Sequence, residues 1–127
     1  MVHRHLACLA MMLSAAPGWP QAQTRIVTGQ VGVLGEWELT ATVEEAGERT
    51  ERHWFGPLSL RHIGFCGADG PETRSGELRL QVSQRQAVAT LTIDGTACTF
   101  RGQLKSGYAG VMRCADRRDV PMLLSFD

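Results

Sequence analysis

The sequence predicts an all-β fold, a small antiparallel meander barrel or sandwich of about 7–8 strands. From Gly35 onward the apolar residues recur at every second position, which is the period of a strand and not of a helix. Turn signals separate the alternating runs, and a chain of 127 residues has room for one domain.

The start of the chain differs from the rest and predicts a signal peptide. Arg4, between two histidines, gives a short basic region, and an uncharged run of eleven residues follows it. Such a run is too short to span a bilayer but suits a signal peptide, with cleavage after Gly18 or Ala22. We therefore expect a signal peptide over residues 1–22, one β domain over residues 23–127, and a periplasmic or secreted protein without a membrane anchor.

The first strands of the mature chain follow from alternation. Apolar residues alternate with Glu and Thr from Trp37 to Val43, which predicts a strand with one buried and one wet face. The charged run EEAGERTER, residues 44–52, predicts a solvated hairpin tip or loop. In HWFGPLSLRHIGFC, which comes next, Trp54 and His62 share parity, so we expect both side chains to point inward.

Alternation resumes at residues 78–82 and 89–93. The second run ends at Asp94-Gly95, a strong hairpin signal because both central residues of a type I′ turn need positive φ. This turn sets Leu91 opposite Cys98, and directly opposed residues share a face. Cys98 is therefore expected to face the core.

Cys98 and Cys114 are predicted to form a disulfide. A turn centred on Ser106 sets them opposite each other, where Cβ atoms are about 4.5 to 5.5 Å apart. Removal of the signal peptide leaves these two and Cys66, an odd number in an oxidising compartment. We expect Cys66 to stay reduced or to pair outside the chain; a link from Cys66 to Cys98 or Cys114 is the competing arrangement.

Gly35-Glu36-Trp37, at the head of the first clear strand, resembles the G-x-W motif of the calycins. This group includes the lipocalins and the small periplasmic inhibitors of bacterial metalloproteases. The resemblance implies a barrel whose closed end is plugged by Trp37. We expect the barrel to close by pairing of the last strand, residues 120–126, with the first, and the short chain argues against a wide ligand cavity.

Residues 62–72, HIGFCGADGPE, hold four side chains of types that bind metals or move protons: His62, Cys66, Asp69 and Glu72. Their spacing matches no firm zinc pattern, and His53 has the opposite strand parity to His62. Asp69-Gly70-Pro71 is typical of a turn, and an inward histidine is usually satisfied by backbone or hydroxyl groups. No nucleophile, base and orienting group occur together, so we predict neither an enzyme nor a cofactor.

The sequence favours a non-catalytic module that binds a protein or a small ligand through loops at one barrel end. Thirteen basic and thirteen acidic residues cancel, so no long-range field would attract nucleic acid. Loops carry function on rigid β scaffolds, and the longest predicted loop runs from Cys66 to Gly76. The candidate ligand-binding residues are in this loop and in the strand before it: Trp54, Phe55, Asp69 and Glu72.

Two other functions stay open. One is a periplasmic inhibitor of a secreted protease, with the polar segment from Gln21 to Arg25 as an inserting trunk. The other is a metal-binding protein or enzyme that uses His62 and Cys66.

Overall fold

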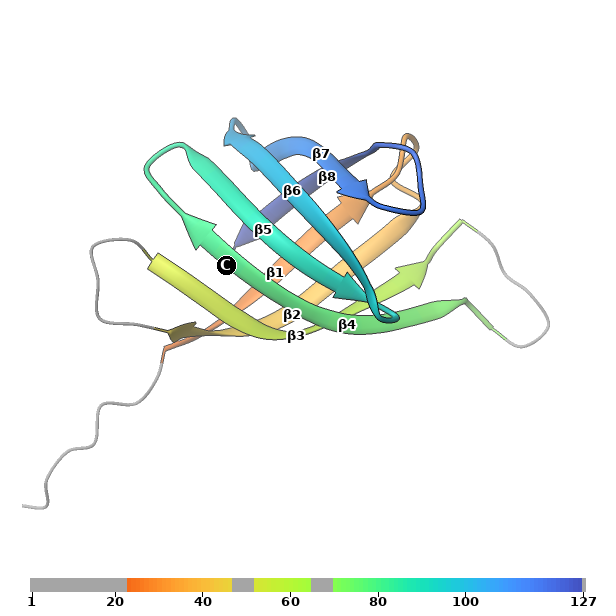
Figure 1. The fold of residues 1–127 in the computed structure, drawn as a ribbon, viewed down its shortest axis with the longest axis horizontal. Coiled ribbons are helices and arrows are strands. Elements are labelled where there is room, and N and C mark those ends of the chain that lie inside the picture. Colours follow the sequence, from red (N-terminus) through yellow and green to blue (C-terminus); the bar gives the residue numbers. More distant parts are fainter. Residues whose placement is uncertain (1–22, 47–51, 65–69, 127) are drawn as a thin grey trace, which may run out of the picture.

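The computed structural model describes residues 23–46, 52–64 and 70–126, and it shows a closed antiparallel barrel of eight strands (Figure 1). The strands are β1 (Thr24–Val31), β2 (Trp37–Ala46), β3 (Arg52–His62), β4 (Thr73–Val82), β5 (Gln86–Ile93), β6 (Thr96–Leu104), β7 (Tyr108–Cys114) and β8 (Val120–Phe126). Each strand pairs with the next, and β8 pairs with β1. The predicted all-β fold and meander barrel are confirmed, while the predicted signal peptide lies outside the described residues.

Barrel closure uses β1, which precedes the strand that begins at Trp37. Residues 27–31 of β1 pair with β8, so the last strand closes the barrel as expected but against an earlier partner. The inward side of β1 includes Gly29, and Ile26 on its outward side is 45% exposed. With a glycine on its inward face and an isoleucine on its outward face, β1 lacks the apolar–polar alternation by which the other strands are recognised.

Both predicted hairpin registers are confirmed. Asp94 and Gly95 occupy the turn between β5 and β6 with φ angles of 49° and 82°. Leu91 lies opposite Cys98, and Cys98 lies opposite Cys114. The two cysteines form the predicted disulfide, which indicates an oxidising environment of the extracellular type.

Side chains fill the barrel interior. The buried apolar residues come from β1 to β8, and no polar or charged residue is buried in the described part of the chain. An eight-stranded barrel is just wide enough for its own side chains to fill. A ligand can therefore be held at a barrel end or on the outer surface. No helix in the described ranges is long and apolar enough to cross a membrane.

Candidate ligand site at the barrel mouth

One barrel end, which we call the mouth, gathers four connections: β1–β2, β3–β4, β5–β6 and β7–β8. A pocket of about 290 Å³ opens there. Small-molecule pockets typically begin at about 300 Å³, so this one suits a compact ligand or a single side chain of a partner. The short chain predicted the absence of a wide cavity, and the pocket is correspondingly small.

The floor and walls of the pocket are mainly apolar. Val31, Leu60 and Met112 reach it from the core, and Val120 lines it from the first position of β8. The Cys98–Cys114 disulfide also lines the pocket and ties β6 to β7. These side chains meet here because inward positions near the ends of several strands converge on the barrel axis.

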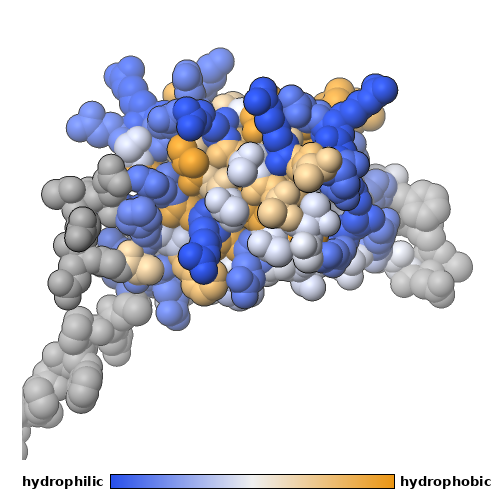
Figure 2. Space-filling model, viewed as in Figure 1, coloured by the Kyte–Doolittle hydropathy of each residue, from blue (hydrophilic) through white to orange (hydrophobic). Residues whose placement is uncertain are grey.

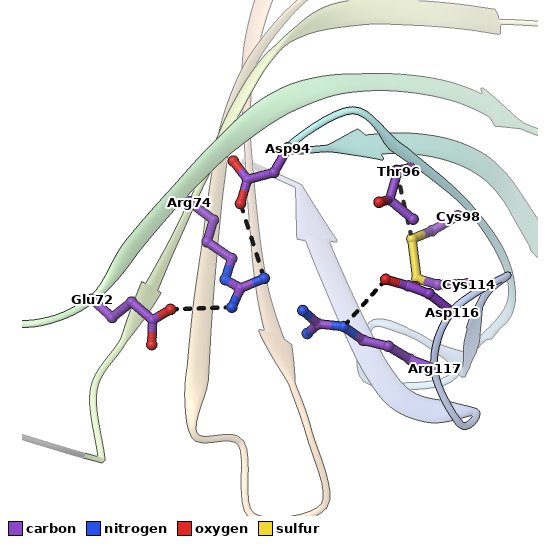
Figure 3. A network of polar contacts seen from close by, with 8 residues as sticks. All are labelled: Glu72, Arg74, Asp94, Thr96, Cys98, Cys114, Asp116 and Arg117. Carbon is purple, nitrogen blue, oxygen red and sulfur yellow. Dashed lines mark hydrogen bonds and ion pairs between the residues drawn. A yellow bond between two sulfur atoms is a disulfide. The ribbon is translucent and has the colours of Figure 1, made fainter.

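Charged side chains form the rim of the mouth (Figure 3). Arg74 on β4 lies 3.1 Å from Glu72 and 3.9 Å from Asp94. Across the mouth, Nε of Arg117 lies 3.9 Å from Asp116. The two guanidinium groups point toward each other from opposite sides in Figure 3. Each guanidinium has five N–H donors, so both keep donors beyond those used in these ion pairs.

Trp37 holds Arg74 in place. The indole ring lies under the Arg74 guanidinium, 5.6 Å from its central carbon, and meets the His62 ring edge-on at 4.8 Å. The Arg74 side chain is only 28% exposed, so its position at the rim is well defined. The predicted inward direction of His62 is confirmed by this contact. Trp37 thus lies beside an open pocket and lines it, in contrast to the sealed end that the calycin resemblance implies.

The predicted ligand-binding residues are not brought together. Glu72 lies at the mouth, in the ion pair described above. Trp54 is 3% exposed inside the barrel near the opposite end, and Phe55 points outward because consecutive strand residues face opposite sides. Asp69 lies outside the described residues. Residues 73–76 of the expected loop belong to β4, which already begins at Thr73.

The site residues that sequence reasoning missed are Arg74, Asp94 and Arg117. Each comes from a different connection or strand end, and no spacing in the chain joins them. One signal was available. In a meander, alternate hairpins open to the same end, so the strand order alone places these three residues at one mouth.

The structure also bears on the two alternatives. Thr24 and Arg25, the last two residues of the segment expected as an inserting trunk, belong to β1 and pair with β2, while residues 21 and 22 lie outside the described residues. Among the described residues no group of three or more His, Cys, Asp or Glu side chains could hold a metal ion. Cys66 lies outside those residues, so the His62/Cys66 hypothesis stays a prediction.

The protein folds as a closed, eight-stranded antiparallel barrel, and this architecture is consistent with a calycin-like barrel. Comparisons with protein-family models, curated proteins and solved structures give no match. The function must therefore be inferred from the geometry of the mouth.

Proposed function

We propose that the protein is an exported, non-catalytic binding module that takes a compact amphipathic ligand into its mouth. The observation that supports this is the apolar pocket of about 290 Å³ beneath two opposed guanidinium groups. At about 30 Å³ for each water-sized group, the pocket has room for roughly ten non-hydrogen atoms.

Arg74 and Arg117 favour a ligand whose head group accepts hydrogen bonds. Guanidinium groups bind carboxylates through charge-assisted hydrogen bonds. Glu72, Asp94 and Asp116 pair with these two guanidinium groups, and Glu36 also lines the pocket, so the rim has no net positive charge. A singly charged head that uses the remaining guanidinium N–H donors therefore suits the rim better than a phosphate. A straight-chain carboxylate of about eight carbons combines this head with a tail that matches the pocket volume.

We expect octanoate to bind at the mouth with a dissociation constant of about 0.2 to 1 mM, from roughly 0.4 to 0.5 kcal/mol for each of its non-hydrogen atoms. Arg117→Gln should weaken binding at least about fivefold, because it removes a charged donor from the rim. Val120→Phe should abolish binding, because the larger side chain would occupy the pocket. Calorimetric titration and chemical-shift mapping of the mouth residues measure both effects.

Two controls separate pocket binding from unspecific adsorption. Octylamine has the same tail with a cationic head, and we expect it to bind at least about fivefold more weakly than octanoate. Ile26→Phe makes a comparable enlargement on the outer surface of β1 and should leave octanoate binding unchanged. Equal octanoate binding by the wild type and Val120→Phe would show that octanoate does not bind in the pocket.

The β1–β2 loop favours a second candidate, a protein partner. Val33 and Leu34 are 83% and 89% exposed, beside the mouth. Gly32 and Gly35 bound this tip with φ angles of 108° and 62°, and the Gly35 amide donates to the Gly32 carbonyl at 3.1 Å. The Leu34 amide donates to the Glu36 carboxylate at 3.0 Å. A preorganised loop with two aliphatic side chains suits insertion into an apolar subsite, as an inhibitor of an exported protease requires.

For this candidate we expect inhibition of at least one member of a panel of secreted metalloproteases. Leu34→Asp should reduce the inhibition at least about tenfold, because a charge would enter an apolar subsite. Ile26→Asp places the same charge on the outer face of β1 and should leave inhibition unchanged. Unaltered cleavage rates with every protease in the panel would eliminate the inhibitor function and leave the octanoate proposal intact.

A further inference from the structure

A shallow groove crosses the outside of the barrel from β3 to β7, separate from the mouth. Two adjoining depressions form it and share Val88 and Thr90. Phe55 of β3 lies opposite Arg79 of β4, which lies opposite Thr90 of β5. Thr90 in turn lies opposite Thr99 of β6. With neighbouring strands about 4.8 Å apart, five strands give the groove a length of about 19 Å.

The groove is basic although the chain has no net charge. Arg79, Arg101 and Arg113 line it, and no carboxylate is among the described residues that line it. Arg113 pairs with Asp119 at 3.1 Å, whereas Arg79 and Arg101 form no ion pair with another described residue. The groove therefore offers two uncompensated guanidinium groups to a ligand.

Apolar side chains separate these arginines. Val88 lies opposite Arg101, and Arg101 lies opposite Val111. Val88 and Val111 are 36% and 41% exposed, and Phe55, under the Arg79 guanidinium at 5.1 Å, is 40% exposed. Figure 2 shows pale and orange surface between blue side chains on the face over β4 to β6. Apolar and charged positions thus alternate across β5 to β7, while the threonines Thr90 and Thr99 lie in the row that contains Arg79.

We infer that this groove is a docking surface for an extended acidic segment of a partner protein, in which carboxylates alternate with apolar side chains. Carboxylates would meet Arg79 and Arg101, and apolar side chains would pack on Val88 and Val111. A polyanionic glycan or a nucleic acid would use the arginines alone and leave the apolar positions uncovered. Charge complementarity and the alternation together favour a peptide. The groove shares no lining residue with the mouth pocket, so this inference does not rest on the proposed function.

The probe is a fluorescein-labelled peptide of about eight residues that alternates glutamate with valine or leucine, long enough to span the groove at about 3.4 Å per residue. Fluorescence anisotropy should show binding that weakens steeply as salt is added. The double variant Arg79→Gln/Arg101→Gln should weaken binding at least about tenfold, the factor that corresponds to about 1.4 kcal/mol. Val88→Ser should weaken it about threefold or more through lost apolar contact.

The control Arg61→Gln/Arg118→Gln removes the same number of positive charges outside the groove. It should change the affinity for the peptide less than about twofold, because charges distant from a binding surface contribute little to affinity. Thermal melting of each variant verifies that the barrel is folded. The salt dependence of peptide binding is measured on the wild type, so this test stands even where a variant fails to fold. Absence of peptide binding at low salt, or equal loss with the control pair, would overturn the inference. Tight binding of heparin, together with peptide binding that Val88→Ser does not weaken, would also overturn the inference. A surface that binds any polyanion through its arginines would give this result.

Discussion

Gly76→Ala is expected to lower the free energy of unfolding by about 3 kcal/mol or more, a large share of the 5 to 15 kcal/mol typical of a whole domain. A Cβ atom at this position would fall well inside van der Waals contact with the carbonyl oxygen of Thr92 on β5. That oxygen belongs to backbone and cannot rotate away as the end of a side chain could. Because β4 is paired on both sides, to β3 and β5, relief would require breaking part of a ladder. Urea denaturation followed by circular dichroism measures the loss.

Gly64→Ala is the matched control. Its added Cβ would lie 3.6 Å from the Cβ of Glu36, an ordinary contact, and we expect a change within about 0.5 kcal/mol. A loss below about 1 kcal/mol for Gly76→Ala would show that β4 and β5 can separate at this point at little cost.

The same close approach occurs at two further inward glycines. A Cβ at Gly56 would collide with the carbonyl oxygen of Thr42, and one at Gly110 with that of Arg101. Glycines inside strands mark sharp bends and close backbone contacts, which a small closed barrel needs. Next to Gly56, Pro57 has no N–H to give to the ladder. These glycines therefore contribute to barrel closure as well as to strand pairing.

The parts of the fold that could be predicted are those set by local chemistry. The Asp94-Gly95 turn requires positive φ at both positions, and from it the strand period fixes which residues face the core. The turns on either side of β6 then set the registers of β6 with β5 and with β7, and these registers locate Cys98 opposite Cys114 without knowledge of any other strand. By contrast, the alternation of apolar and polar residues does not reveal β1, because Gly29 occupies an inward position where an apolar side chain is expected.

The side-chain contacts at the mouth could not be predicted from local spacing, because they join residues from several strand ends. The sequence predicts ligand-binding roles for Trp54 and Phe55 from their position before the longest loop, yet strand geometry places one in the core and the other on the outer surface. The Arg74 guanidinium reaches the rim because Trp37, from a different hairpin, lies beneath it. Such a contact has no counterpart in sequence spacing. It follows only from the order in which the strands close the barrel.

Breaking the Cys98–Cys114 disulfide is expected to lower the free energy of unfolding by about 3 kcal/mol, because a closed loop of this length removes conformational entropy from the unfolded chain. The two cysteines are 16 positions apart, and Cys98 is 2% exposed in the folded barrel. Since the disulfide also lines the mouth pocket, its loss should weaken octanoate binding as well. Urea denaturation with and without the reductant TCEP measures the first effect, and calorimetric titration the second.

The double variant Cys98→Ala/Cys114→Ala should unfold at the same urea concentration as the reduced wild type, and TCEP should not shift it further. Cys66→Ala tests the remaining cysteine: we expect its transition to match that of the wild type and to keep the full response to TCEP. These outcomes follow if Cys66 is reduced or linked to another molecule, because in either state it closes no loop within the chain. A non-reducing peptide map that links Cys66 to Cys98 or Cys114 within one monomer would contradict both the pairing and the hairpin registers that predict it. A TCEP-insensitive wild type would contradict the expected contribution of the disulfide to stability.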